Sequence, residues 1–292
     1  MRKKSGASSA YRRPQLDWHL GGSRFGLGRQ TKIMGVLNVT PDSFSDGGFF
    51  LDPGLAQNQA LRMQEAGAHL IDVGGESSRP GSRPVSAREE IKRIKPVLKR
   101  LSRTLQIPIS IDTYKYDVAH AALDEGAVLV NDIHALKGNK RLARLIARYK
   151  AGVVLMHMQG APLTMQENPY YRNLIKEVRD YLRKAVYFAL EAGIAKSRIA
   201  VDPGFGFGKT GEQNFEVLSR LHELSSLKCP VLVGLSRKSF IGNLLGISVG
   251  DRLYGSLAAA AAAIHQGAHV LRVHDVLPHK HVSALIDRTL WN

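Results

Sequence analysis

The sequence predicts a (β/α)8 barrel, because three features recur along its 292 residues. The first is a series of short apolar, β-branched runs, whose unbroken hydrophobicity is typical of parallel strands buried on both faces. The second is a segment with helical spacing of apolar residues between successive runs. The third is a glycine that ends several of these segments, as suits a left-handed helix cap. A doubly wound open sheet is the alternative architecture.

The apolar runs expected to form the barrel strands are residues 32–38, 69–73, 107–112, 127–132, 152–157, 199–202, 230–235 and 269–274. Asp52 before Pro53 predicts a helix N-cap and first helical residue, and Ser86 with Glu89 predicts a capping box. Pro96 lies inside the second of these helices and predicts a kink. The glycines expected to end helical segments are Gly67, Gly126, Gly152, Gly193 and Gly267.

The segment before the first barrel strand divides into two parts. Residues 1–14 are basic and predict a solvated leader outside a single barrel domain at 15–292. A nucleic-acid-binding arm is the alternative, although only Tyr11 supplies the aromatic side chain that would favour it. Residues 11–30 place Gly21 and Gly22 between apolar residues, which predicts a β-hairpin plugging the bottom of the barrel.

Composition indicates a globular protein with anionic partners. Hydrophobic residues make up 44% and charged residues 23% of the chain, and the net charge is +16. Cys229 is the single cysteine, so we expect it to pack in the core and to form no intramolecular disulfide. No apolar run reaches the roughly 18 residues of a transmembrane helix, and the basic start lacks an apolar signal region. We therefore expect a cytoplasmic protein with no membrane partner.

Every expected strand ends in polar or ionisable residues. They are Asn38, Asp72, Asp112, Asn131 with Asp132, His157, Asp202, Ser236 to Lys238, and Arg272 with His274 and Asp275. Any one of them has an ordinary structural explanation as a loop cap. A barrel, however, brings all its strand carboxyl ends to one mouth, where such folds bind ligands. Together these residues predict an active or binding site.

The residue types at the strand ends indicate two kinds of ligand. Asp112, Asn131 and Asp202 offer carboxylate and amide groups to a planar, donor-rich heterocycle. Close by in the sequence, glycines alternate with phenylalanines in residues 204–209, which predicts close backbone approach beside an apolar wall.

The remaining strand-end groups suit an anion and a cation. Lys238, Arg272 and His274 are suited to an anionic ligand. Asn38 offers a neutral oxygen of the kind that Mg²⁺ accepts beside phosphate oxygens. Zinc is not predicted, because no His/Cys cluster has ligand spacing.

From about residue 30 onward the chain resembles the dihydropteroate synthase family. The matching segments, in the order of the family, are residues 34–48, 71–81, 110–113, 131–133, 156–160, 202–209, 236–239 and 272–276. The resemblance implies a (β/α)8 enzyme of folate biosynthesis that joins 4-aminobenzoate to 6-hydroxymethyl-7,8-dihydropterin diphosphate with loss of diphosphate. It also implies a Mg²⁺ cofactor and a homodimer with small-molecule partners and no nucleic acid.

The resemblance assigns roles residue by residue. The implied pterin-binding residues are Asp112, Asn131, Met156, Asp202, Phe207 and Lys238. Those implied for diphosphate are Asn38, Arg272 and His274, with Asn38 also the metal ligand. Those implied for 4-aminobenzoate are Ser78, Arg79, Pro80, Phe205 and Ser239. The implied catalytic residues are Asp112, Lys238, Arg272 and His274.

The chain departs from the family pattern at few positions, and three alternative functions are considered. Ser78 stands where Thr is more usual, which leaves the affinity for aminobenzoate and sulfonamides open, and His134 and Ala135 are less typical. The alternatives are a barrel that transfers a methyl group from methyltetrahydrofolate to a corrinoid and a catalytically silent pterin-binding homologue. A nucleic-acid-binding protein is suggested by charge alone.

Overall fold

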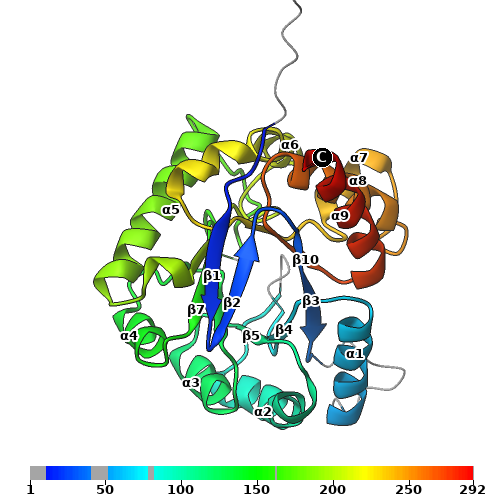
Figure 1. Ribbon diagram of the computed structural model, residues 1–292. Coiled ribbons are helices and arrows are strands. Elements are labelled where there is room, and N and C mark those ends of the chain that lie inside the picture. The colour runs from blue at the N-terminus through cyan, green and yellow to red at the C-terminus, as the bar shows by residue number, and fades with distance from the viewer. Residues whose placement is uncertain (1–10, 41–51, 78–81, 162, 292) are drawn as a thin grey trace, which may run out of the picture.

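The computed structural model describes residues 11–40, 52–77, 82–161 and 163–291, and shows a ring of helices around a cylindrical sheet (Figure 1). The strands of the cylinder are β3 (Lys32–Asn38), β4 (Leu70–Gly74), β5 (Ile109–Asp112), β6 (Leu129–Asp132), β7 (Gly152–Met156), β8 (Ile199–Asp202), β9 (Leu232–Val233) and β10 (Val270–Val273). Each lies within or beside an apolar run of the sequence. The predicted barrel is therefore confirmed.

The sheet is parallel throughout and runs in the order β8-β7-β6-β5-β4-β3-β10-β9. Its two end strands meet through an isolated parallel bridge between Val201 and Val231. Beside it, the backbone N–H of Val201 donates to Pro230 O at 2.9 Å. The bridge closes the cylinder, so the open-sheet alternative is wrong.

Helices follow the strands and cover the outside of the cylinder (Figure 1). They are α1 (Pro53–Glu65), α2 (Ala87–Thr104), α3 (Tyr116–Asp124), α4 (Lys140–Arg148), α5 (Leu174–Glu191), α6 (Gly211–Ser219), α7 (Ser239–Leu245), α8 (Leu253–His265) and α9 (Val276–Leu290), with short 3₁₀ turns η2 (Lys196–Arg198) and η3 (Leu221–Leu227). In the part of the chain that the structure describes, no helix is long and apolar enough to cross a membrane. Cys229 is buried and unpaired, as expected.

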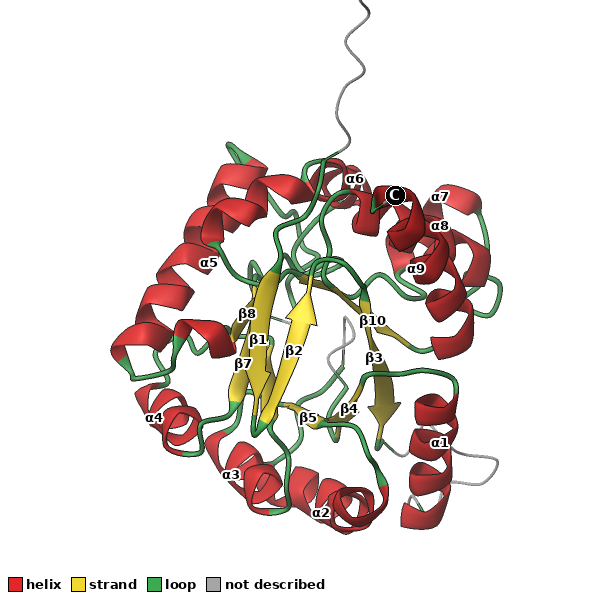
Figure 2. Cartoon of the chain, viewed as in Figure 1, coloured by secondary structure: helices red, strands yellow, loops and turns green. Residues whose placement is uncertain are grey.

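Two antiparallel strands, β1 (Leu16–Leu20) and β2 (Ser23–Leu27), form the expected hairpin across the bottom of the barrel (Figure 2). Their buried side chains Trp18, Leu20 and Leu27 share one apolar cluster with the first residues of several barrel strands, among them Leu70, Leu129, Leu232 and Val270. Since those residues mark the amino ends of the strands, the hairpin seals the end opposite the expected site.

One of the predicted helix-ending glycines has a different role. Gly67, Gly126, Gly193 and Gly267 all have positive φ, as a left-handed cap requires. Gly152 instead begins β7, and the left-handed residue after α4 is Lys150 with φ 50°. A Cβ at Gly152 would collide with the Leu20 side chain of the hairpin. The prediction for Gly152 is wrong because this glycine makes room for the plug.

The helix start signals are confirmed, with one correction. Asp52 caps α1 by accepting from Gly54 N at 2.8 Å, with Pro53 as the first helical residue. Ser86 caps α2 by accepting from Glu89 N at 3.2 Å. The expected reciprocal half of the capping box is absent among the described contacts, because Glu89 pairs with Arg93 at 3.0 Å. Pro96 lies inside α2, which continues as one helix from Ala87 to Thr104.

The solvated leader expected at residues 1–14 is corrected at its carboxyl end. Arg13 is only 2% exposed and pairs with Asp287 of α9 at 2.5 Å. Its guanidinium also donates to Thr31 Oγ1 at 2.8 Å and to Ala268 O at 2.6 Å. Arg13 therefore belongs to the folded domain, and residues 1–10 lie outside the described part of the chain.

Candidate active site

Four side chains from neighbouring strands meet at the barrel mouth, the end formed by the strand carboxyl termini. Arg272 of β10 donates from Nε to Asp72 Oδ2 at 2.6 Å and from Nη2 to Asp112 Oδ2 at 2.7 Å. Asn131 Nδ2 donates to the same Asp72 oxygen at 3.0 Å. Asp72 is 0% exposed, so this one buried carboxylate orients both an arginine and an amide.

Burial controls the charges of this cluster. It raises the pKa of Asp112 to about 7, with Arg272 opposing the rise and Asp72 adding to it. Burial also disfavours the charged form of Arg272, but the adjacent Asp72 and Asp112 outweigh it and raise its pKa. Asp72 Oδ1 is buried and has no hydrogen-bond partner among the described residues. A permanent cation thus stands beside carboxylate oxygens that still have capacity to accept hydrogen bonds.

An apolar wall stands on the other side of the mouth. Met156 ends β7 and Phe207 lies in the loop after β8, and both belong to one buried cluster with Ile133, Met158 and Met165. Lys238 places its ammonium 4.3 Å from the centroid of the Phe207 ring, within the range of a cation–π interaction. A flat aromatic ligand would find sulfur and ring surface here, next to the polar groups of the mouth.

Asp202 ends β8 and supplies a further carboxylate to the same mouth. Its Oδ1 accepts from Gly204 N at 2.7 Å, which leaves Oδ2 for another donor. Burial raises the pKa of Asp202 to about 6, while the hydrogen bond from Gly204 and the charge of Lys238 lower it. The structure therefore brings all six predicted pterin residues into the mouth: Asp112, Asn131, Met156, Asp202, Phe207 and Lys238.

The glycine-rich loop after β8 approaches neighbouring backbone as its sequence predicts. Gly204, Gly206 and Gly208 all have positive φ. A Cβ at Gly204 would collide with His157 O, and one at Gly208 with Gln159 O. Only glycine permits both that conformation and that approach, so the prediction of close backbone contact is confirmed.

Asn38 and His274 occupy the side of the mouth near β3 and β10. His274 Nδ1 lies 3.1 Å from Ser236 Oγ, which also accepts from His274 N at 3.3 Å. Asn38 stands near Asp112 across Gly74, where a Cβ would lie 3.7 Å from Asn38 Oδ1 and 3.9 Å from Asp112 Oδ2. The bare α-carbon of Gly74 thus opens a space lined by two oxygens.

The donor set near Asn38 fits one kind of metal. Over the described ranges, no group of three or more His, Cys, Asp or Glu residues could hold a metal ion. A zinc or calcium cage built from such side chains is therefore not formed by those residues. Mg²⁺ usually keeps several waters and takes one or two protein oxygens beside substrate phosphates, which is compatible with Asn38.

Some strand-end residues serve loops. Asp132 accepts from His134 N at 2.8 Å and Leu136 N at 2.7 Å, and burial raises its pKa to about 6. Arg237 forms two hydrogen bonds of 2.9 Å with Asp275. These groups hold the backbone of the mouth and do not meet the central cluster.

The residues implied for 4-aminobenzoate are not brought together in the described part of the chain. Phe205 is 1% exposed and stacks on Phe240 with centroids 6.3 Å apart, so its ring lies in the packed layer between strands and helices. Ser239 is exposed and begins α7, as predicted. Ser78, Arg79 and Pro80 lie outside the described residues, as do residues 41–51 of the loop after β3.

A charged network beside the mouth is not predicted by the sequence. Lys115 Nζ donates to Glu76 Oε2 at 2.5 Å, Glu90 Oε2 at 2.7 Å and Val85 O at 2.7 Å. Glu76 also accepts from Val85 N at 2.8 Å and from the Tyr114 hydroxyl at 3.0 Å. Its only sequence signal was a carboxylate, Glu76, shortly after a strand that ends at the mouth. Its other members come from distant segments that only the fold unites.

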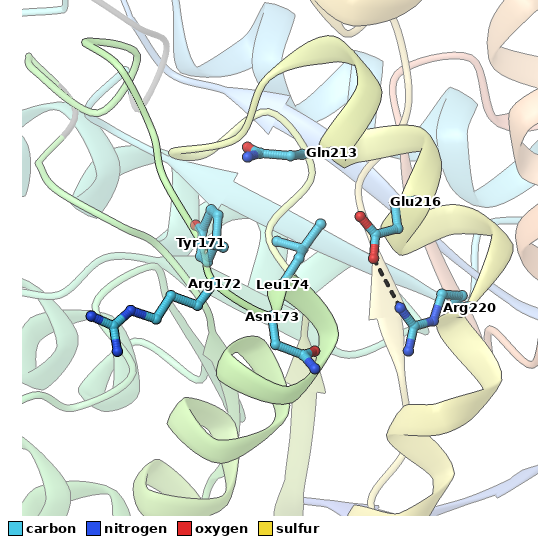
Figure 3. Close-up of a pocket in the computed structure, with 7 residues that line it drawn as sticks. All are labelled: Tyr171, Arg172, Asn173, Leu174, Gln213, Glu216 and Arg220. Carbon is cyan, nitrogen blue, oxygen red and sulfur yellow. Dashed lines mark hydrogen bonds and ion pairs between the residues drawn. The ribbon is translucent and has the colours of Figure 1, made fainter.

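A cavity of about 300 Å³ lies between the start of α5 and α6, away from the cluster of Asp72, Asp112 and Arg272 (Figure 3). It is lined by Tyr171, Arg172, Asn173, Leu174, Gln213, Glu216 and Arg220. Arg220 is engaged with Glu216 at 2.9 Å across one side of the cavity (Figure 3). None of the lining residues is among the predicted site residues. Its link to the mouth is the Tyr171 hydroxyl, which donates to Gly208 O at 2.7 Å.

The barrel is similar to proteins of one known family. A family model described as pterin binding enzyme matches residues 34–274. Dihydropteroate synthase of Synechocystis sp. is 44% identical over 273 residues, which cover 93% of this chain and 94% of that protein. Residues 34–274 include seven barrel strands in full and all but the first two residues of β3.

Solved structures agree with the sequence matches. Yersinia pestis dihydropteroate synthase with a sulfonamide drug complex superposes with a TM-score of 0.88 at 41% identity, covering 94% of this chain and 98% of that one. Xanthomonas albilineans dihydropteroate synthase with 4-aminobenzoic acid gives a TM-score of 0.88 at 39% identity, covering 96% and 100%. On the strength of the matched barrel, its mouth and these relatives, the chain belongs to the dihydropteroate synthase family.

Proposed function

We propose that this protein is a transferase that joins 4-aminobenzoate to the methylene carbon of 6-hydroxymethyl-7,8-dihydropterin diphosphate, giving 7,8-dihydropteroate and diphosphate. The observation that carries the proposal is the array of Asp72, Arg272 and Asp112 at the mouth. It sets a permanent cation against buried carboxylates, within one barrel end that also holds Asn131 and Lys238. That combination suits a substrate with a donor-rich ring at one end and an anion at the other.

The pterin is proposed to bind between the polar cluster and the apolar wall. Asp112 and Asp202 would accept ring N–H groups, and Asn131 would complete the in-plane contacts. Met156 and Phe207 would cover a ring face, as their shared buried cluster supports. Lys238, held over the Phe207 ring at 4.3 Å, would donate to a ring acceptor from the same side.

The diphosphate is proposed to lie near Asn38, Arg272 and His274. Asn38 would be a ligand of Mg²⁺, which would supply charge neutralisation to the diphosphate when bound. Arg272 carries a permanent charge and His274 is held by Ser236, so both are positioned to receive an anion. Fixed positive groups of this kind stabilise the charge that develops on a leaving phosphate.

In the proposed reaction the carbon–oxygen bond to diphosphate breaks first, and both electrons leave with the diphosphate. The methylene cation that remains is delocalised into the pterin ring, where the carboxylate of Asp112 would stabilise it. Arg272, which contacts Asp112 at 2.7 Å, would favour the ionised form of that carboxylate and face the departing anion from the same position. The aryl amine then forms the carbon–nitrogen bond and releases its proton to solvent.

The 4-aminobenzoate site remains a proposal carried by the resemblance. A relative from Xanthomonas albilineans, whose structure is described with 4-aminobenzoic acid, supports the substrate class. Ser78, Arg79 and Pro80 are proposed to line this site, with Ser239 exposed at the start of α7. Because its ring is covered by Phe240, Phe205 would act by supporting the loop behind the site.

A homodimer is proposed as the assembly. Large apolar side chains are exposed on neighbouring parts of α7, α8 and their connection, namely Leu244, Leu245, Val249 and Tyr254. A second copy of the chain would cover this surface, since contiguous exposed apolar patches mark interaction sites. Light scattering after size exclusion should give twice the 32.1 kDa chain mass, and a Tyr254→Glu variant should give the monomer mass.

Formation of 7,8-dihydropteroate by purified protein, given both substrates and Mg²⁺, tests the function. We expect turnover, and a loss of at least about 100-fold in kcat/KM for Lys238→Ala, as for removal of a charge that contacts substrate. Lys184→Ala, an exposed lysine on α5, is the matched control and should retain full activity. Pterin binding without any product would instead favour a silent pterin-binding homologue.

A further inference from the structure

Lys209, a residue with no role in the proposed reaction, is one of the most deeply buried charged groups of the protein. It follows the glycine-rich loop after β8 and is 2% exposed. Its Nζ lies 2.9 Å from Gly204 O, 3.0 Å from Phe207 O and 3.0 Å from His157 Nδ1. These three acceptors match the three N–H donors of an ammonium group.

The same contacts fix the state of His157. Burial lowers the pKa of Lys209 to about 7, with the charge of Asp202 opposing the shift. In its ammonium form Lys209 can only donate, so Nδ1 of His157 then accepts and the ring proton resides on Nε2. Burial lowers the pKa of His157 to about 2, with the charge of Lys209 adding to the effect. The neutral ring is also packed edge-on against Tyr181, with centroids 4.9 Å apart. Lys209 is therefore tied to a packed acceptor directly after β7.

The loop that Lys209 holds carries groups of the mouth. Asp202 stands at its start, hydrogen-bonded to Gly204 N, and Phe207 stands near its end beneath Lys238. Lys209 binds the carbonyls of Gly204 and Phe207, so one ammonium spans the loop between the carboxylate and the aromatic wall. The left-handed glycines within this span give it little intrinsic preference for the observed shape.

Other contacts attach the loop elsewhere. Gln166 Nε2 donates to Gly206 O at 2.6 Å, Tyr171 donates to Gly208 O, and Asn214 Oδ1 accepts from Gly206 N at 2.7 Å. These contacts keep the loop attached without Lys209. None of them reaches the carbonyl of Phe207, whereas the carbonyl of Gly204 also accepts from Phe207 N at 3.1 Å within the loop.

We propose that Lys209 is a positioning residue for the pterin: its buried ammonium joins the carbonyls of Gly204 and Phe207 to His157 and thereby sets the place of Phe207 opposite the pterin-binding carboxylates. This inference rests on the proposed function, because it concerns the pterin end of that site. Since Lys209 is 2% exposed, its ammonium would act through the loop and Phe207 and not by touching the pterin.

The test compares Lys209→Met with Lys196→Met. Lys196 also donates to a backbone carbonyl, that of Leu227, at 2.9 Å, but it lies in the η2 turn, which contacts the hairpin plug. We expect Lys209→Met to raise the Kd of 6-hydroxymethyl-7,8-dihydropterin and the KM of its diphosphate on the order of tenfold, as when a partner that orients a ligand is removed. The KM for 4-aminobenzoate should stay within about twofold. Lys196→Met should leave all three constants unchanged.

Several results would overturn the inference. A Lys209→Met protein with a lower melting temperature but wild-type pterin affinity would make Lys209 a purely structural residue. If Lys209→Met does not fold, Lys209→Gln, which keeps two N–H donors, takes its place with the same expected direction. Nitrogen-15 NMR of the wild type below pH 7, where Lys209 is an ammonium, should show His157 protonated at Nε2, and protonation at Nδ1 under those conditions would contradict the contact. A wild type without pterin binding or turnover would instead refute the proposed function and with it this role for Lys209.

Discussion

Asp72 is the residue on which the geometry of the mouth depends most. It is fully buried, yet one of its oxygens accepts from Arg272 and from Asn131, which are proposed to bind opposite ends of the substrate. A residue in this position connects the pterin and diphosphate ends of the site without contacting either ligand. The sequence marked Asp72 as a strand-end carboxylate but gave no indication of this double contact.

Replacement of Asp72 tests that connection. Asp72→Asn keeps the shape and one acceptor oxygen but removes the charge, so the charge-assisted contact with Arg272 and the contact with Asn131 would both weaken. We expect kcat/KM for the pterin diphosphate to fall about 10- to 100-fold, the usual cost of removing an orienting partner. Steady-state kinetics would measure it, with Asp117→Asn on the outer helix α3 as the control. Wild-type kinetics in Asp72→Asn would contradict this role.

The pKa of Asp112 gives a second prediction at this scale. Because burial raises the pKa of Asp112 to about 7 and that of Asp202 to about 6, both carboxyls are largely protonated at pH 5 and ionised at pH 8. Carboxylates accept pterin N–H groups and acids do so less well, so pterin affinity should rise with pH through this range. Calorimetry with 6-hydroxymethyl-7,8-dihydropterin, which lacks the titrating diphosphate, would measure it. A pterin affinity that is independent of pH from 5 to 8 would contradict the raised pKa values of Asp112 and Asp202.

Some residues at the mouth show why sequence alone could not sort binding groups from loop supports. Asp112 and Asp132 are both carboxylates at the end of neighbouring strands. Only the structure shows that Asp132 accepts two backbone N–H groups of its own loop, whereas Asp112 faces Arg272. The difference depends on the path of the backbone after the strand, which residue type does not encode.

Among the elements, the hairpin packs closely against β7 because Gly152 has no side chain. Gly152→Ala would place a methyl group in the space of Leu20, and overpacking of this kind costs about 1–3 kcal/mol of unfolding free energy. Denaturant unfolding would measure the loss, and Gly211→Ala, where nothing lies within 4 Å, is the control. Combining Gly152→Ala with Leu20→Ala should cost less than the sum of the single changes. Strict additivity would contradict the proposed contact.

Elements were predictable where their signals are local. Each expected strand is present because a continuous apolar run can only be buried on both faces, and Asp52 with Pro53 specifies a helix start by itself. The Ser86 capping box was only half right, because Arg93 competes for Glu89. The prediction for Gly152 was wrong because the side chain that requires a glycine there, Leu20, lies far away in the sequence.

On the scale of the whole molecule, Arg13 ties the segment before the hairpin to the last helix. Its partner Asp287 lies on α9, and the pair is buried. Arg13→Ala would leave a buried carboxylate without its cation, which typically costs about 3–5 kcal/mol of unfolding free energy. The exposed pair of Arg24 and Asp17 offers the control, since Arg24→Ala should leave the free energy of unfolding nearly unchanged. Equal losses for both variants in denaturant unfolding would show that Arg13 is not anchored as described.

The overall architecture followed from the sequence because a barrel repeats one local pattern, strand, helix and glycine, around a closed sheet. Closure itself was not predictable in detail: it depends on a single bridge beside the two-residue strand β9. The role of Arg13 was missed for a related reason, since a basic segment without apolar periodicity is usually solvated and Asp287 is distant in the chain.

In the proposed reaction the barrel mouth couples loss of diphosphate to capture of the pterin by an aryl amine. The most direct measurement quantifies diphosphate and 7,8-dihydropteroate together, in purified protein given the pterin diphosphate and Mg²⁺, with and without 4-aminobenzoate. Equal amounts of the two products are expected when 4-aminobenzoate is present, with at least about 100-fold slower formation of both in Asp112→Ala. Dihydropteroate formation at the wild-type rate in Asp112→Ala, or no product from the wild type, would contradict the proposed reaction.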